Sequence, residues 1–180
     1  MPTCLLHNGN MCVKQNAIAA RKSDTTVRVA YGYDWGTITD NSVLVRWHVE
    51  EIFKKLKEQY GINFEMFSLG GRSGSIYCDI CAQLQGSDVA LFDVSTHNVN
   101  VAFELGVAVG VGTSVFVLRS NHYKQQKRAF SDLNGILEYR FTRKAGDLRF
   151  EANFSRAFTD KLIQAAVRRI SIPRIEDVPF

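Results

Sequence analysis

Glu104 stands alone as a formally charged side chain in the most apolar part of the sequence. No other Asp, Glu, Lys or Arg lies between Val94 and Leu118. A carboxylate in such surroundings is costly unless it is paired, hydrogen-bonded or used in a reaction. The apolar run just before it, Val89 to Asp93, ends in a second carboxylate. Because ligands of open α/β sheets bind at the carboxyl ends of the strands, these two residues are the first candidates for a reactive site.

The chemistry that suits such carboxylates is cleavage of a glycosidic bond. A carboxylate in surroundings of low polarity stabilises the oxocarbenium-like cation that forms as the bond breaks. Two carboxylates, Glu104 and Asp93, would suit transfer between neutral nucleosides, whose leaving base needs a proton. In NAD⁺ the nicotinamide is already cationic and leaves neutral, so one carboxylate suffices. The structural alternatives are a Glu that stabilises a helix start and an Asp that caps a turn.

Neighbouring residues could hold a nucleotide. Asn98 or Asn100 would cap the helix that carries Glu104. The glycine-rich loop from Gly70 to Ser75 precedes another helix, where Arg72, Ser73 and free backbone N–H groups could bind a phosphate. The loop lacks the Gly-Lys-Ser/Thr ending of a P-loop, and a plain turn is an equal alternative.

Aromatic and basic residues add further candidates with open alternatives. Tyr31, Tyr33 and Trp35 follow the first expected strand and could stack on a base or on nicotinamide, or belong to the core or a lid. The basic stretch from Arg119 to Arg128 is better interpreted as a solvated loop than as a phosphate site.

The elements that must position these residues alternate between short strands and helices. Strands are expected at 27–31, 63–68, 89–94, 114–118 and 136–141, with helices after 40, near 76–84, at about 100–109 and from about 147. This alternation predicts a parallel sheet of five strands that is covered on both faces. We divide the chain into an N-terminal extension (1–25), one domain (26–171) and a tail or linker (172–180).

Composition limits the class of protein. The chain has 180 residues, 46% hydrophobic and 22% charged, with a net charge of +4, which is ordinary for one soluble globular domain. No signal peptide, membrane span or nucleic-acid-binding arm is expected, and the predicted location is the cytoplasm. We expect no metal site and expect the four cysteines to be reduced thiols: Cys4, Cys12, Cys78 and Cys81. The alternative is a zinc site that these cysteines form with His7.

The residues from Ser87 to Gly106 carry a family resemblance. Ser-Asp-Val-Ala-Leu-Phe-Asp-Val-Ser (87–95) followed by Asn-Val-Asn-Val-Ala-Phe-Glu-Leu-Gly (98–106) resembles a pattern of prokaryotic TIR-like nucleotide-binding domains and their relatives, the nucleoside 2-deoxyribosyltransferases. The match is strong over residues 72–110, and the order of elements agrees from about 26 to 170. The resemblance implies a flavodoxin-like three-layer sandwich with a central, mostly parallel five-stranded sheet.

The resemblance also implies an activity. Glu104 occupies the place of the family's catalytic glutamate, and NAD⁺ is expected as the substrate, with no cofactor. The implied function is an NAD⁺ glycohydrolase that depletes NAD in antiviral defence, acting as a homo-oligomer with a shared active site and controlled by a fused or separate sensor. The substrate-binding set is Tyr31, Gly32, Arg72, Ser73, Asp93, Ser95, Asn98 and Asn100.

Two other functions stay open from the sequence. In a nucleoside 2-deoxyribosyltransferase, Glu104 would be a nucleophile that forms a covalent glycosyl-enzyme. In a nucleotide-sensing or assembly module, the same residues would bind a ligand without turnover.

Overall fold

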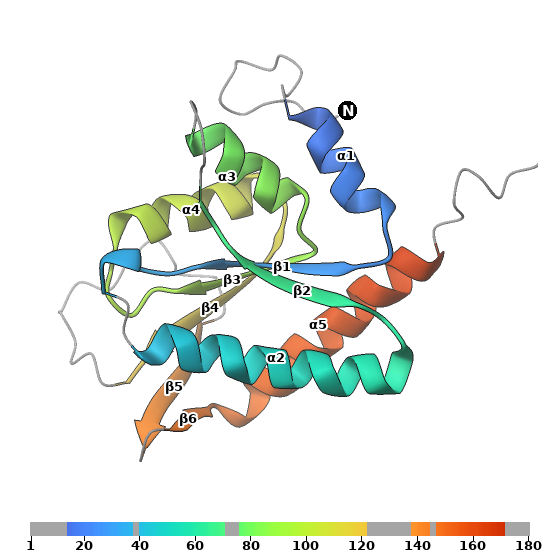
Figure 1. Cartoon of the computed structure of the whole chain (residues 1–180). Coiled ribbons are helices and arrows are strands. Elements are labelled where there is room, and N and C mark those ends of the chain that lie inside the picture. Colours follow the sequence, from blue (N-terminus) through green and yellow to red (C-terminus); the bar gives the residue numbers. More distant parts are fainter. Residues whose placement is uncertain (1–13, 38–39, 71–75, 122–137, 145–146, 172–180) are drawn as a thin grey trace, which may run out of the picture.

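A computed structural model describes residues 14–37, 40–70, 76–121, 138–144 and 147–171. These residues form an α/β protein with one sheet (Figure 1). The strands are β1 (Val27–Gly32), β2 (Phe64–Ser68), β3 (Val89–Asp93), β4 (Ser114–Ser120), β5 (Glu138–Lys144) and β6 (Asp147–Phe150). The helices are α1 (Gln15–Ser23), the short 3₁₀ helix η1 (Trp35–Thr37), α2 (Asp40–Tyr60), α3 (Ile76–Gln85), α4 (Val99–Gly110) and α5 (Ala152–Ser171).

The sheet has the strand order β2-β1-β3-β4-β5-β6. The first five of these strands run parallel, and β6 pairs antiparallel with β5. The order of the parallel strands is that of flavodoxin-like folds, in which the chain winds away in both directions from the boundary between β1 and β3. Crossover loops on the two sides of this boundary diverge, so the carboxyl ends of β1 and β3 are where such sheets bind ligands.

Helices cover both faces of the sheet and make three layers. In Figure 1, α3 and α4 lie above the sheet, and α2 and α5 lie below it. One buried cluster joins the lower face of the sheet to residues such as Val45 of α2 and Phe158 of α5. A second cluster joins the upper face to residues such as Leu84 of α3 and Leu105 of α4. The three-layer, flavodoxin-like α/β architecture expected from the sequence is therefore confirmed.

The sheet has one strand more than expected. We predicted that the last helix begins near Asp147, but Asp147–Phe150 forms β6, and α5 begins at Ala152. Leu148 is 7% exposed, and Phe150 packs against the aromatic ring of Phe141 with centroids 5.7 Å apart. Alternate apolar residues over only four positions give a weak sequence signal for a strand, which explains the difference.

The N-terminal part of the described chain is docked on the domain. Ile18 of α1 is buried and packs with Ala82 of α3. Lys14 lies 3.0 Å from a carboxylate oxygen of Asp79 on the same helix, α3. The segment expected to be a loosely attached extension thus contains a docked helix; residues 1–13 lie outside the described ranges.

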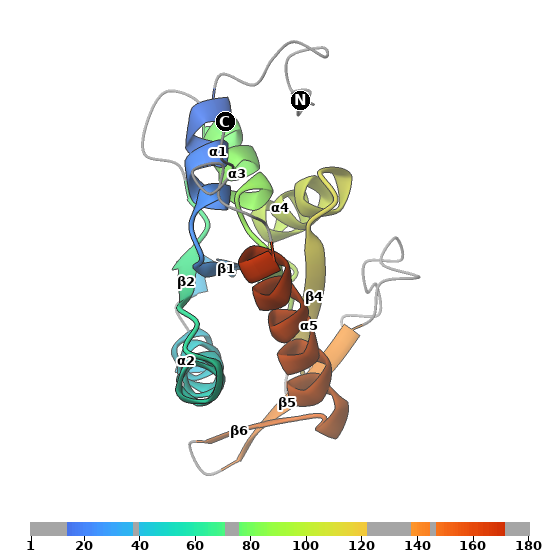
Figure 2. The ribbon, with the colours of Figure 1, turned by 90° about the vertical axis from the view of Figure 1, so that its right-hand side faces the viewer.

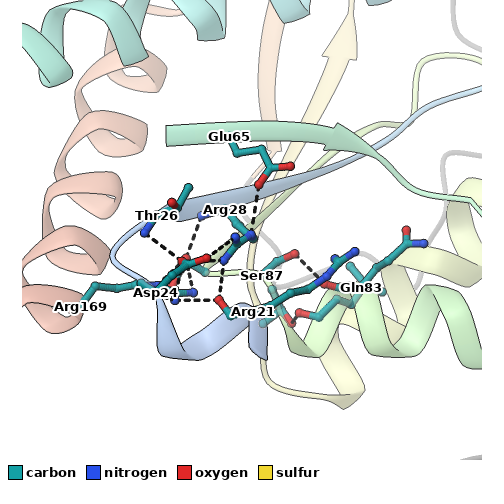
Figure 3. Close-up of polar contacts among 11 residues, drawn as sticks. Arg21, Asp24, Thr26, Arg28, Glu65, Gln83, Ser87 and Arg169 are labelled. Carbon is teal, nitrogen blue, oxygen red and sulfur yellow. Dashed lines mark hydrogen bonds and ion pairs between the residues drawn. The ribbon is translucent and has the colours of Figure 1, made fainter. Parts of the chain in front are cut away.

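A polar cluster fixes the end of α1 at the amino edge of the sheet (Figure 3). The carbonyl oxygen of Arg21 accepts hydrogen bonds from the guanidinium groups of Arg28 (2.5 Å) and Arg169 (2.9 Å). Arg28 also pairs with Asp24, and Arg169, whose side chain is 6% exposed, pairs with Asp88 at 2.9 Å. Figure 2 shows α1 beside α3 with α5 approaching from the opposite face. The cluster joins α1, α5 and the starts of β1 and β3.

Candidate functional site

Glu104 is placed by a well-capped helix. The side-chain oxygen of Asn98 accepts hydrogen bonds from the backbone N–H groups of Asn100 (2.8 Å) and Val101 (3.4 Å). Asn98 is therefore the N-cap of α4, and Asn100 is an exposed residue of its first turn. The first turn holds no acidic residue, so Glu104 lies too far along the helix for its charge to serve mainly as a partner of the helix N-terminus.

The carboxylate of Glu104 lies over the end of β1. A Cβ atom added to Gly32 would lie 2.9 Å from Oε2 of Glu104 and 2.5 Å from the ring of Phe92. Gly32 is the last residue of β1 and pairs with Phe92 of β3. The absence of a side chain at Gly32 makes room for both groups. Glu104 thus occupies the boundary between β1 and β3 at the carboxyl edge, where this topology binds ligands.

Burial changes the acidity of Glu104. Desolvation raises its pKa from 4.5 to about 7, because an ionised carboxylate is poorly stabilised in partly apolar surroundings. Within the described part of the chain, Glu104 has no hydrogen-bond or ion-pair partner. A carboxyl group with a pKa near neutrality and no partner is characteristic of a group kept for chemistry.

Asp93 points away from Glu104. Side chains alternate along β3, so Asp93 shares a face with Leu91 of the α2–α5 cluster, whereas Phe92 belongs to the α3–α4 cluster. Burial raises the pKa of Tyr31, a residue of the α2–α5 cluster, and the charge of Asp93 adds to that rise. Asp93 therefore lies on the face of the sheet that α2 and α5 cover, whereas Glu104 approaches from the face that α3 and α4 cover.

Asp93 organises the turn after β3. Its Oδ1 accepts hydrogen bonds from the backbone N–H of Ser95 (2.9 Å) and from the Ser95 hydroxyl (2.5 Å). The Ser95 oxygen in turn accepts a hydrogen bond from the backbone N–H of Ser120 (2.7 Å), which ties the turn to β4. Burial raises the pKa of Asp93, the bonds from Ser95 oppose that rise, and the charge of Asp34 adds to it. The structure thus supports the capping role weighed for Asp93.

Three aromatic rings form a column at the end of β1. The ring centroids of Tyr31 and Tyr33 lie 4.8 Å apart, and those of Tyr33 and Trp35 lie 5.2 Å apart, both stacked. The column runs from the core to the surface, since Tyr31 is 0% and Trp35 is 57% exposed. Asp34 accepts a hydrogen bond from the backbone N–H of Gly36 (3.0 Å), which fixes the turn that carries Trp35. The sequence suggested that these aromatic residues stack on a ligand or belong to the core or a lid, and in the structure they stack on one another.

Sequence reasoning missed a basic residue at the same edge. Arg46 of α2 donates from Nη2 to the Ser68 hydroxyl (2.8 Å), and Ser68 lies 3.5 Å from the phenol oxygen of Tyr33. Arg46 also lies 3.9 Å from Glu50. The missed signal was the place of Arg46 next to Val45, on the border of the buried stripe of α2, where a long charged side chain reaches the end of the sheet.

Several buried polar atoms without hydrogen-bond partners lie at this edge, and one, Nη1 of Arg21, lies at the amino edge. Among the described residues they include the Tyr31 phenol oxygen, Oδ1 of Asn41, Oγ1 of Thr96 and Nε of Arg119. Tyr31 and Arg119 lie at the ends of β1 and β4, Thr96 follows β3, and Asn41 is near the start of α2. Buried groups of this kind need an explanation, and a bound ligand or ordered water is the usual one.

Other expected site residues fall elsewhere. Arg72 and Ser73 lie outside the described residues, so their role as phosphate ligands stays a prediction. Gly70 is held by the side-chain amide of Gln83, which donates to the Gly70 carbonyl at 2.5 Å. Arg119 forms an ion pair with Glu138 at 2.9 Å.

Metal and membrane features were also sought in the structure. Cys78 and Cys81 are buried in α3 and are not joined in a disulfide, and Cys4 and Cys12 lie outside the described ranges. Over those ranges, His, Cys, Asp and Glu form no group of three or more that could hold a metal ion. The helices described are all too short or too polar to cross a membrane.

The fold and the site define a three-layer α/β protein with polar and aromatic groups at its carboxyl edge. No protein-family model and no curated protein sequence matches the chain. Among solved structures it is similar to a mutant of the flavo di-iron protein from Thermotoga maritima, with 15% sequence identity and a TM-score of 0.44. The match covers 83% of this chain and 38% of that chain. A likeness of this size carries no argument about what this chain binds.

Proposed function

We propose that the chain is an NAD⁺ glycohydrolase that cleaves the bond between nicotinamide and ribose with Glu104 as the catalytic residue. The observation that carries this proposal is the carboxylate of Glu104, partly buried and without a described partner over Gly32. Its pKa of about 7 lets it be ionised at physiological pH while it stays sensitive to a nearby positive charge. The resemblance of residues 87–106 to TIR-like domains supports the same assignment.

The reaction uses Glu104 as an electrostatic group. As the N-glycosidic bond breaks, its electron pair passes to the nicotinamide nitrogen, and positive charge develops on the ribose ring. The Glu104 carboxylate stabilises that charge, and its partly apolar surroundings strengthen the effect. Water then adds to the anomeric carbon and releases a proton, which gives ADP-ribose. Asn98 and Ser95 act indirectly, because one caps the helix of Glu104 and the other shapes the turn before it.

The positions of the two carboxylates favour NAD⁺ over a neutral nucleoside. Transfer between neutral nucleosides needs an acid to protonate the leaving base. Asp93 leaves the opposite face of β3 and is held by Ser95, so it does not pair with Glu104 for this purpose. Nicotinamide leaves NAD⁺ as a neutral molecule and needs no such acid.

We extend the proposal to the biological setting that the family resemblance implies. The protein would deplete NAD⁺ in the cytoplasm of a prokaryote under viral attack, as a homo-oligomer in which a neighbouring protomer completes the site, under the control of a fused or separate sensor. A shared site makes the rate per protomer rise with protein concentration.

Nicotinamide release from NAD⁺, followed by chromatography over a range of protein concentrations, tests the proposal. Glu104→Gln keeps the shape of the side chain and removes its charge, and we expect the rate to fall by at least about 100-fold. The matched control is Glu58→Gln, which alters an exposed residue of α2 and should leave the rate unchanged. Full turnover by Glu104→Gln would refute the assignment; base exchange between nucleosides, or nucleotide binding without release, would favour the two alternatives.

A further inference from the structure

The aromatic column at the end of β1 has an unused face. Tyr31, Tyr33 and Trp35 stack in order, and Trp35 at the outer end is 57% exposed. One face of Trp35 lies against Tyr33, with 17° between the ring planes. Among the described residues, no second aromatic ring covers its other face. The exposed face of an indole at the end of a stack is available to bind a planar group, because aromatic rings pair by stacking.

The position of the column relates it to Glu104. Gly32 lies in β1 between Tyr31 and Tyr33, and the Glu104 carboxylate lies over Gly32. The column occupies the α2 side of the strand end, and Glu104 approaches from the α4 side. Both lie at the carboxyl end of β1, so a ligand that contacts both must pass over this strand end from the α4 side to the α2 side.

The charges around the column favour a cation. Asp34 lies between Tyr33 and Trp35, and the carboxyl groups of Asp93 and Glu104 lie at the same edge. Among the described residues, the cation Arg46 also lies near the column, with its guanidinium bound to Ser68 and 3.9 Å from Glu50. Electron-rich aromatic faces attract cations, and the attraction increases when the cation is partly desolvated.

We propose that the exposed face of Trp35, backed by Tyr33 and Tyr31 and flanked by Asp34, binds the positively charged pyridinium ring of a nicotinamide nucleotide and selects it over the neutral ring. This inference rests on the proposed function and gives the column a role in it. Breaking the glycosidic bond moves an electron pair to the ring nitrogen and makes the ring neutral. The cation–π attraction is then lost, so the column binds substrate and releases product.

Binding of two small probes tests the inference without turnover. 1-Methylnicotinamide carries the cationic ring and has no ribose to cleave, whereas nicotinamide is neutral. The chain has two tryptophans, Trp35 and Trp47, which are 57% and 55% exposed, so Trp47→Phe and Trp35→Phe give matched proteins with one tryptophan each. In Trp47→Phe we expect saturable quenching of Trp35 fluorescence by the cation, with at least about tenfold weaker binding of nicotinamide.

The companion protein supplies the baseline. In Trp35→Phe, the remaining Trp47 should show only linear, collisional quenching by the same cation. Linear quenching of Trp35, or equal binding of the cationic and neutral probes, would overturn the inference. Asp34→Asn preserves the acceptor for the Gly36 N–H and removes the charge, so it should reduce the preference for the cation about threefold while the fold is kept.

The outcomes separate this inference from the proposed function. Saturable binding of 1-methylnicotinamide by a protein that never cleaves NAD⁺ would support ring binding by the column and contradict the proposed hydrolase activity. Cleavage of NAD⁺ with an unchanged KM in Trp35→Leu would support the hydrolase activity and contradict ring binding by the column.

Discussion

The carboxyl group of Glu104 is harder to ionise in the folded protein than in the unfolded chain. Its pKa rises from 4.5 to about 7 because burial penalises the charge, which is unusual for a residue kept on the surface of a helix. Ionisation of Glu104 therefore lowers the free energy of unfolding of the protein. Such a cost is expected where stability is exchanged for a reactive group.

Glu104→Gln should therefore stabilise the protein in a way that depends on pH. Below pH 4.5 the carboxyl group is neutral in both folded and unfolded chains, so we expect little difference from the unsubstituted protein. Between pH 4.5 and 7 the unfolded chain ionises first, and the difference grows and then levels off. At about 1.4 kcal/mol per pKa unit the shift corresponds to roughly 3 kcal/mol, which solvent screening reduces to about 1–2 kcal/mol.

Thermal unfolding of both proteins at pH 4.5 and pH 8 measures this effect. A Tm gain that is the same at the two pH values would contradict the burial argument for Glu104, because only ionisation gives the pH dependence.

At the residue scale, the isolation of Glu104 among apolar residues made it a candidate from the sequence, whereas the sequence left open whether Asp93 shares the site or caps a turn. Successive strand residues point to opposite faces of the sheet, so an error of one residue in the expected register places a side chain on the wrong face. Neighbouring residues such as Arg46 and Asp34 were missed because their relation to the site depends on how α2 and the loop after β1 pack.

At the scale of elements, the end of β1 and helix α4 fit together because Gly32 has no side chain. Gly32→Ala would place a Cβ 2.5 Å from the ring of Phe92, which is 0% exposed, and 2.9 Å from Glu104. Overpacking of this kind costs about 1–3 kcal/mol of stability. Displacement of Glu104 should also lower the rate of nicotinamide release by about tenfold or more.

Gly106→Ala is the matched control for this prediction. It adds the same methyl group two residues after Glu104, where a Cβ would meet nothing within 4 Å. Alanine in place of glycine inside a helix should stabilise the protein by about 0.5–1 kcal/mol and leave the rate unchanged. Chemical denaturation and rate measurements on both variants check the pair; equal effects at the two glycines would show that Gly32 is not a tight contact.

Five parallel strands and the helix of Glu104 could be predicted because each shows either an apolar run or an alternation of apolar and polar residues, bounded by loop residues. β6 and α1 could not be predicted in the same way. β6 depends on pairing with β5, and α1 buries Ile18 and is otherwise held through charged side chains such as Lys14 and Arg21. Elements held by partners distant in sequence leave little periodic signal of their own.

On the scale of the whole molecule, the two edges of the sheet serve different purposes. The amino edge carries the cluster in which Arg169 joins α5 to Asp88 and to the end of α1 (Figure 3). The carboxyl edge carries Glu104, the aromatic column and buried polar atoms without described partners. One buried atom without a partner, Nη1 of Arg21, lies at the amino edge and several lie at the carboxyl edge, so the unpaired groups are concentrated where the proposed site lies.

Arg169→Leu tests this division. It would leave Asp88 partly buried without its guanidinium partner, and loss of one member of such a pair costs about 3–5 kcal/mol. We expect a lower Tm and faster amide hydrogen exchange in α1, with the rate of nicotinamide release at low temperature within about twofold of the unsubstituted protein. Arg168→Leu, at the exposed neighbouring position, should change none of these quantities. Loss of turnover at temperatures where Arg169→Leu is fully folded would contradict the separation of the two edges.

The pH dependence of kcat/KM for nicotinamide release from NAD⁺ tests the central claim most directly. In the proposed reaction the active form of Glu104 is the carboxylate, and burial raises the pKa of this group to about 7. The account predicts that kcat/KM rises about tenfold per pH unit below 7 and levels off above it, with Glu58→Gln following the same curve and Glu104→Gln showing residual, pH-independent activity. A flat profile between pH 5.5 and 8.5, or the same rising profile in Glu104→Gln, would show that another group carries the reaction.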